Sequence, residues 1–210
     1  GRWAGAGPLT FTSLTGITST DSLYSYDADW GAGSGAPAPF QSGYTGFLST
    51  EREREVLSQE FRLDSSEQEN AFGWIDRWTL GLFFEMLEED SFVEYVEQGS
   101  GFATVNSLYE TETAAAFAQF LKHISSDRRL ILGLRAEHHS VDFASSANDQ
   151  YAFATVLDGR SSQEDPLFGA KLTLEQDLGA AHMLFASAAR GYKAGGANSG
   201  SFRFAFDPPT

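Results

Sequence analysis

The chain of 210 residues contains no cysteine and only 6 prolines. Without cysteine, a disulfide scaffold and any thiolate metal site are excluded. Basic side chains are also scarce, because 14 Lys and Arg stand against 29 Asp and Glu and leave a net charge of −15. A surface of this charge repels phosphate backbones, so nucleic acid is not expected as a partner. No stretch reaches the ~20 consecutive apolar residues that a membrane-spanning helix needs.

What the sequence does contain favours strands. It has 18 Phe and 21 Gly, a composition that suits close-packed sheet better than a helical bundle. Between residues 78 and 86, large apolar side chains occupy every second position, and Thr79, Gly81, Phe83 and Glu85 occupy the positions between them. A period of two predicts a β-strand with one apolar and one polar face. A polar turn at 125–128 joins two further runs of this kind and predicts a hairpin over 113–143.

The same pattern along the chain predicts an all-β fold, an antiparallel up-and-down meander of about seven strands. The expected strands are 9–26, 56–63, 78–86, 114–124, 130–136, 168–175 and 183–192. Their connections alternate between long loops, at 30–50, 91–107, 144–165 and after 194, and short turns, at 64–70, 125–128 and 179–181. Long loops at one end and short turns at the other are typical of outer-membrane β-barrels. About ten residues of tilted strand rise ~23 Å, close to the ~25 Å apolar band of such barrels.

On this interpretation one face meets lipid and the other lines the lumen. The lipid-facing side chains are expected to be Trp78, Leu80, Leu82, Leu130, Leu132, Leu134, Leu172 and Leu174. The charged residues expected to form the lumen wall are Glu60, Arg62, Glu85, Arg135, Glu137, Lys171 and Glu175. Aromatic residues near the loop ends are expected in an interfacial girdle or in contact with ligand; these are Tyr24, Tyr26, Trp30, Tyr44, Tyr95 and Tyr109. The alternating run 51–55 is expected to extend its strand into solvent above the membrane.

No motif predicts an enzyme, a cofactor or a metal site, so no residue is assigned as catalytic, cofactor-binding or metal-ligating, and the ligand-binding residues are left unassigned. The acidic cluster around Glu85, Glu88, Glu89, Asp90, Glu94 and Glu97 is interpreted as a solvated rim, because no calcium-loop pattern is present. His138 and His139 point to opposite faces of a strand, which prevents joint ligation. The GAGSGA stretch at 31–36 follows no buried parallel strand and opens no helix, so it is interpreted as a flexible loop.

A rival interpretation is a soluble β-sandwich with a lectin-like binding function. In a sandwich the same apolar faces would pack on each other across ~10 Å instead of meeting acyl chains.

Several segments, in order, resemble TonB-dependent outer-membrane receptors. LSQEFRL at 57–63 followed by WTLGLFF at 78–84 resembles the family's "SQE-RL … W-GLFY" pattern, and AAFAQ at 115–119 with LILGLR at 130–135 is similar to its next hairpin. LFASAARGYKAGGAN at 184–198 is similar to its "YASYARGYKAGGFN" strand, with Ala197 where the family often has Phe. The order of these segments matches from residue 14 onward.

The resemblance implies that residues 1–210 are an arc of a roughly 22-stranded transmembrane β-barrel. Such a receptor sits in the outer membrane of Gram-negative bacteria as a multi-pass barrel and touches outer-membrane lipid. It encloses a plug, binds an extracellular small molecule and imports it when the energy-coupling protein TonB pulls on the plug. An iron-siderophore complex is the favoured ligand, and cobalamin or another scarce nutrient is the alternative. The plug, the TonB-contacting segment and the remaining strands are not in this sequence, so energy coupling is expected only of the parent protein.

Overall fold

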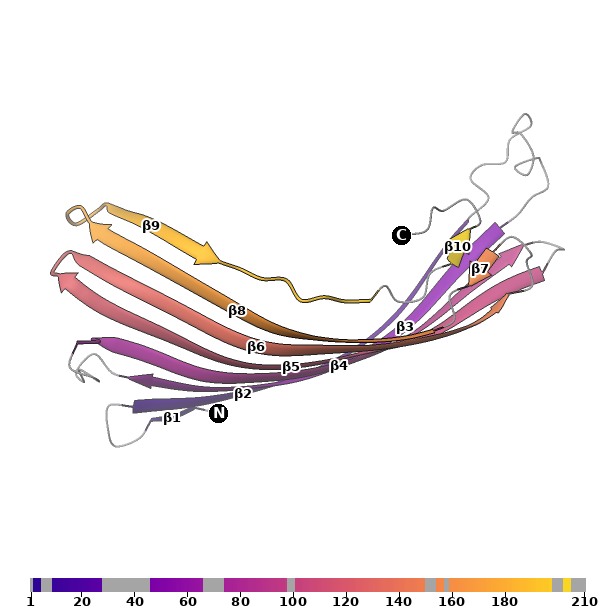
Figure 1. Cartoon of the computed structure of the whole chain (residues 1–210), viewed down its shortest axis with the longest axis horizontal. Coiled ribbons are helices and arrows are strands. Elements are labelled where there is room, and N and C mark those ends of the chain that lie inside the picture. The colour runs from indigo at the N-terminus through magenta and orange to yellow at the C-terminus, as the bar shows by residue number, and fades with distance from the viewer. Residues whose placement is uncertain are drawn as a thin grey trace, which may run out of the picture.

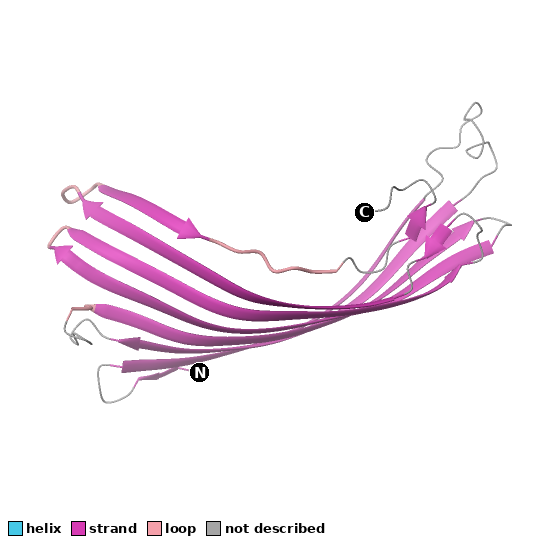
Figure 2. Cartoon of the chain, in the orientation of Figure 1, coloured by secondary structure: helices cyan, strands magenta, loops and turns pink. Residues whose placement is uncertain are grey.

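The computed structural model describes residues 2–4, 9–27, 46–65, 74–97, 101–149, 154–156, 159–197 and 202–204. These residues form strands and their connections, without a helix among them (Figure 2). The elements are β1 Arg2–Ala4, β2 Leu9–Asp27, β3 Gly46–Ser65, β4 Arg77–Glu97, β5 Gly101–Ser125, β6 Arg128–Asp149, β7 Ala154–Val156, β8 Gly159–Asp177, β9 Met183–Arg190 and β10 Phe202–Phe204. No helix in this part of the chain could cross a membrane.

The long strands form one antiparallel meander. The sheet order is β1-β2-β3-β4-β5-β6-β8-β9, and β7 pairs separately with β10. Figure 1 shows the strands running side by side as one long, bent sheet. The predicted hairpin is confirmed, since Ser126 and Asp127 alone separate β5 from β6. The predicted turn at 179–181 is also present, with Gly179 at a φ of 83° that favours glycine. The prediction of seven meandering strands is therefore confirmed, with the three-residue β1 added at the edge.

The strands are much longer than predicted, and the interpretation of 91–107 and 144–165 as long loops is wrong. β4 continues to Glu97 and β5 begins at Gly101, so only residues 98–100 connect them. Likewise β6 runs to Asp149 and β8 begins at Gly159. Most of these residues are polar, and they stay in the sheet because backbone hydrogen bonds to both neighbours need no apolar side chain. β3 also begins earlier than predicted, at Gly46, while 30–45 and the loop at 31–36 lie outside the described residues.

The register fixes two distinct faces. One, the charged face, carries all seven residues predicted for the lumen wall. The other, the apolar face, carries all eight predicted lipid-facing residues, because Leu80 lies opposite Leu63 on β3 and Ala118 on β5, and Leu132 lies opposite Phe120 and Leu172. Within the described strands the only register shift between these partners falls near His123, at the very end of β5. The two faces therefore persist along the whole sheet.

Large side chains on the apolar face are open to the surroundings. Leu82 is 48% exposed, Phe84 45%, Met86 55% and Leu172 46%. These residues lie in the half of the sheet nearest the connections 66–76, 126–127 and 178–182, which we call the turn end. Among the described residues no second sheet layer covers them, since the only other sheet is the short β7–β10 pair. The packed apolar interior that a β-sandwich requires is not seen in this part of the chain.

A small core instead lies on the charged face at the opposite, loop end. Its side chains are at most 5% exposed; they are Thr50, Val93, Tyr95, Ala103 and Val105. Thr50, Val93 and Val105 are direct cross-strand partners, as are Tyr95 and Ala103. The loop end is thus stabilised by ordinary burial on one face, which explains how strands of polar composition remain ordered there.

At the turn end, Asp76 ties the start of β4 to the end of β5. Its carboxylate accepts hydrogen bonds from the backbone N–H of His123 and from Lys122 Nζ at 2.9 Å. These hydrogen bonds hold the pKa of Asp76 below its ordinary value; the one from the His123 N–H has the larger effect, and the one from the Lys122 ammonium the next largest. A carboxyl with a lowered native pKa stabilises the fold above its unfolded pKa, and this contribution is lost as the pH falls through the native pKa.

We therefore expect Asp76→Asn to lower the melting temperature at neutral pH and to matter progressively less in acid. The difference in melting temperature between wild type and variant should have its largest value above about pH 5. It should shrink once the pH drops below the ordinary aspartate pKa of about 3.9. Thermal unfolding followed by circular dichroism from neutral to acidic pH measures it. A difference that stays constant or grows in acid would show that the Asp76 carboxylate does not act through these hydrogen bonds.

Candidate functional site: the charged face of the sheet

The charged face carries paired side chains rather than isolated charges. At the loop end, Glu89 on β4 lies between two arginines of β3. Arg52 Nε is 3.1 Å from Glu89 Oε1, and Arg54 Nε donates a 2.6 Å hydrogen bond to Oε2. Glu89 is only 3% exposed, while the arginine side chains are 35% and 46% exposed. One buried carboxylate thus pairs with two half-exposed guanidinium groups.

Nearer the turn end, two further arginines form pairs along their own strands. Arg62 contacts Glu60, and Arg135 contacts Glu137 through Nε at 2.8 Å and through a second nitrogen at 2.6 Å. Residues two apart on a strand share a face, so each pair forms without a cross-strand partner. Tyr192, beyond β9, joins the second pair: its hydroxyl accepts from Arg135 Nε and donates to Glu137 Oε2, both at 2.9 Å.

Two phenylalanines lie between these arginines. The guanidinium of Arg62 is 6.0 Å from the ring centre of Phe117, and that of Arg135 is 5.4 Å from Phe83. Both are cation–π distances. Phe117 lies directly opposite Gly81, whose missing side chain leaves room for the ring: a Cβ there would be 2.1 Å from Phe117 Cζ. The glycine therefore allows an aromatic ring to lie on a charged wall.

We expect Gly81→Ala to destabilise the protein by about 1–3 kcal/mol, because the Phe117 ring must leave its position and lose its contact with Arg62. Gly133→Ala is the matched control, since it lies on the same face and a Cβ there meets nothing closer than 3.9 Å. Chemical denaturation of both variants measures the difference. Equal stability of the two variants would contradict the packing of Phe117 on Gly81.

Ion pairs also occur close to the turns. Arg129 on β6 contacts Glu175 on β8 and lies 3.8 Å from Asp177. Five of the seven predicted wall residues therefore take part in ion pairs, namely Glu60, Arg62, Arg135, Glu137 and Glu175. The other two share the face by register: Glu85 lies opposite Ser58 and Thr113, and Lys171 lies opposite Gly133.

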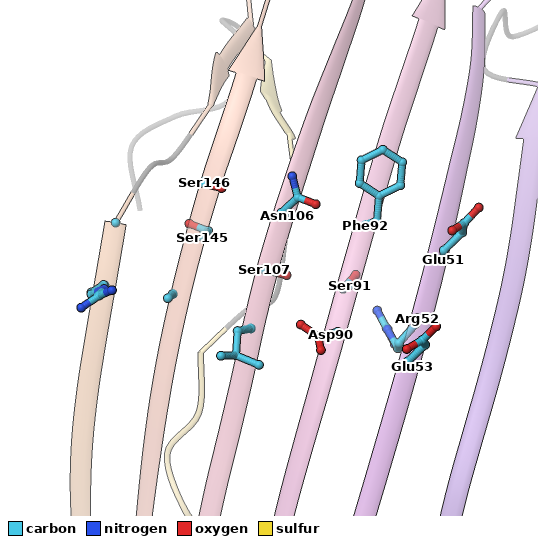
Figure 3. A pocket seen from close by; sticks show the side chains of 14 residues that line it. Glu51, Arg52, Glu53, Asp90, Ser91, Phe92, Asn106, Ser107, Ser145 and Ser146 are labelled. Atoms are coloured by element: carbon cyan, nitrogen blue, oxygen red, sulfur yellow. The ribbon is translucent and has the colours of Figure 1, made fainter.

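The predicted acidic cluster divides between the two faces. Glu85 and Glu89 lie on the charged face, whereas Glu88, Asp90 and Glu94 lie on the apolar face beyond its apolar part. The interpretation as a solvated rim is wrong for Glu89, which is buried, and the side chain of Glu97 lies outside the described residues. There Glu55, Glu88, Glu110 and Asp142 form a row of direct neighbours on four adjacent strands. A hollow of about 780 Å³ lies beside this row, and Glu51, Glu53 and Asp90 gather around it (Figure 3). In the described ranges no three acidic or histidine side chains are close enough to hold a metal ion.

Other predicted residues are placed as follows. His139 on the charged face forms a 2.9 Å hydrogen bond between its Nδ1 atom and Thr113 Oγ1, and His138 lies on the opposite face.

The run 51–55 is part of strand β3, as predicted. Its glutamates lie on the apolar face, and its two arginines form ion pairs with Glu89. The prediction of an interfacial girdle is wrong for Tyr24, Tyr26, Tyr95 and Tyr109, because all four lie on the charged face by register, away from the predicted lipid side. The alternative, contact of these tyrosines with a ligand, stays a prediction. Trp30 and Tyr44 fall outside the described residues.

Sequence reasoning missed the roles of Phe117 and Tyr192. Phe117 lies in an alanine-rich run, where its place on the charged face follows only from the pairing of β5 with β4 and β6. Tyr192 was expected in the last strand, but β9 ends at Arg190 and residues 191–197 leave the edge of β8 (Figure 1). The backbone N–H of Gly195 then donates to Asp165 Oδ2 at 2.8 Å, which ties this segment to the charged face of β8.

No protein-family model matches the chain. A search of curated proteins by sequence also gives no match. Among solved structures, the ferric yersiniabactin uptake receptor FyuA from Yersinia pestis is similar, with a TM-score of 0.69 and 13% sequence identity. The similarity covers 89% of this chain and 26% of that receptor, so the chain spans about a quarter of its length. Because only 13% of the residues are identical, the similarity shows the fold alone: the chain is an all-β antiparallel meander, as in the wall of that β-barrel receptor.

Proposed function

We propose that the chain is part of the wall of a TonB-dependent transport receptor in the outer membrane of a Gram-negative bacterium. The observation that carries the proposal is the division of one sheet into an exposed apolar face and a face of paired charges over all its long strands. In a membrane barrel, lipid excludes charge from the outside only, while a water-filled lumen accepts it. The similarity in fold to a ferric siderophore receptor supports this proposal.

The dimensions agree with a membrane wall. On β4 the apolar positions run from Trp78 to Met86, followed on the same face by Glu88 and Asp90. About nine residues at ~3.3 Å each, tilted by ~45°, rise ~21 Å, which approaches the ~25 Å apolar band of such barrels. The remaining half of each strand would then stand outside the membrane, where acidic side chains on the apolar face meet water. The loop end would point outward and the turn end toward the periplasm.

In this proposal residues 1–210 belong entirely to the barrel domain, and the plug and the other strands belong to the rest of the protein. The function is uptake of a scarce small-molecule nutrient, an iron-siderophore complex first among the candidates, with energy supplied by TonB through the plug. The chain itself contributes lumen wall and lipid contact. No catalytic role is assigned to it.

Two experiments on the source bacterium test the proposal. Fractionation of cells that produce the tagged intact protein should recover it with outer membranes and require detergent for extraction. Deletion of the gene should reduce uptake of ⁵⁵Fe supplied as ferric siderophore under iron limitation. Recovery of the intact protein in the buffer-soluble fraction would overturn the membrane assignment. Outer-membrane recovery with unchanged iron uptake would retain the barrel and exclude the siderophore as its ligand.

A further inference from the structure

A groove of about 500 Å³ lies on the charged face where β5, β6 and β8 run side by side near Tyr192. This volume is within the ~300–1,000 Å³ of small-molecule sites. Although the whole chain has a net charge of −15, the charged residues that line the groove are mainly cations. Arg62, Arg135 and Lys171 line it on the charged face, and Glu60 is the one carboxylate among its lining residues. Arg190 on β9 also borders the groove, but its guanidinium lies on the apolar face, 5.9 Å from the centre of the Phe168 ring.

Glycines form the floor of the groove. A Cβ at Gly133 would lie 3.9 Å from the carbonyl oxygen of Lys171 and 4.0 Å from its Cβ, so a small side chain fits there at ordinary contact distance. Gly169, diagonal to it on the neighbouring strand, lies under the Tyr192 ring, and a Cβ on it would come within 3.0 Å of the ring edge. Lys171 is the direct cross-strand partner of Gly133, and Gln119 is its partner on the other side. A lysine and an amide therefore flank a position that carries no side chain.

Within the described part of the chain, the donors that border this space are only partly used by the protein. Arg135 is occupied by Glu137 and Tyr192. Lys171 and Gln119, in contrast, have no ion pair or side-chain hydrogen bond to the described residues. Arg62 bonds Glu60 through one nitrogen, while its buried Nε atom has no hydrogen-bond partner there. The ammonium of Lys171 and the amide of Gln119 are thus the donors that the described residues leave unused, and a carboxylate accepts hydrogen bonds from both.

We propose that this groove binds a carboxylate group of a small molecule, with Lys171 as its main charge partner and Gly133 as its floor. The inference rests on the proposed function and narrows it: the molecule in transit carries carboxylates, which a neutral nutrient would lack. Gln119 orients the group from the other side of Gly133, while Arg135 stays paired with Glu137 and Tyr192. The hollow on the other face is lined by three carboxylates and two arginines, so it lacks the excess of cations that the groove has.

Citrate is the probe, titrated calorimetrically into the purified intact protein in detergent at low salt, with trimethyl citrate as the neutral comparison. We expect wild type to bind citrate and not the ester. Lys171→Gln should weaken citrate binding by about tenfold or more, the effect of losing one charged hydrogen bond. Gly133→Leu, which fills the floor, should abolish it. Arg160→Gln is the control, since it removes one positive charge from the opposite face of the same strand and should leave the affinity unchanged.

The proposal is overturned if wild type binds no citrate, or if Lys171→Gln and Arg160→Gln weaken binding equally, which would indicate charge attraction without a site. Circular dichroism and thermal unfolding of each variant show that the sheet is retained. Outer-membrane recovery and ⁵⁵Fe uptake of the same variants separate the two hypotheses: a protein that sits in the membrane and imports iron but ignores citrate overturns only the groove. A protein that is not a membrane protein overturns the proposed function itself.

Discussion

Replacing Leu132 by Arg is expected to cost the intact protein about 2–4 kcal/mol of folding free energy in lipid, because it places a charge near the middle of the lipid-facing band. Leu132 lies between Phe120 and Leu172 on the apolar face, with Leu130 and Leu134 two residues away on its own strand. No described acid lies directly opposite it, so a new guanidinium there has no carboxylate across the strand.

The control is the next residue along the chain. Gly133→Ser points the new side chain to the charged face, where a Cβ meets no atom closer than 3.9 Å, and a change of this kind is expected to cost less than about 0.5 kcal/mol. Folding titrations in lipid vesicles compare the two variants. Equal losses, or a larger loss for the serine, would reverse the assignment of the faces.

The second large change in stability is expected when Glu89 is substituted, and its neighbour Glu88, on the opposite face, provides the comparison. Glu89→Gln removes the negative charge that both Arg52 and Arg54 contact, and should destabilise the protein by about 1–3 kcal/mol. The expected loss stays below the upper limit for a buried pair because the two arginines are 35% and 46% exposed and water takes over part of their solvation. Chemical denaturation of the purified protein measures the loss.

Glu88→Gln should have the opposite sign. Glu88 lies directly between Glu55 and Glu110 in the row of like charges, and such neighbours destabilise a sheet, so removing one should stabilise by about 0.2–1 kcal/mol. Raising the salt concentration should shrink this gain, since exposed charges are screened. If both substitutions destabilise to the same extent, the separation of the two carboxylates onto different faces is wrong.

Periodicity predicted the strands wherever one face was apolar. The alternation in 78–86 and around Leu132 found both the strands and their facing, and the polar turn at 125–128 found the hairpin. It failed at the loop end, where neither face of 88–92 or 106–112 is consistently apolar. There the sheet is maintained by backbone pairing and by a few buried positions on the charged face, such as Val93 with Tyr95 and Ala103 with Val105. Two apolar residues at a spacing of two are too short a signal to separate a strand from a loop.

The candidate site was predictable in kind but not in detail. Alternation placed Arg62, Arg135 and Lys171 on one face, yet which of them is already neutralised depends on the side-chain contacts. Glu60 and Glu137 could be paired with their arginines from a spacing of two, whereas the role of Tyr192 could not, because it requires the chain to leave β9 after Arg190. The same departure, together with the glycine floor, defines the groove.

Lipid exposure of the apolar face is measured most directly by spin labels on single introduced cysteines, and residues 1–210 contain no native cysteine that would also be labelled. Nitroxides placed one at a time on 130–135 of the intact protein in lipid bilayers would be tested for collision with oxygen, which concentrates in lipid, and with a water-soluble nickel chelate. The account predicts strict alternation, with oxygen access high at 130, 132 and 134 and nickel access high at 131, 133 and 135. Uniform access along the strand, or nickel access at 132 equal to that at 133, would contradict it.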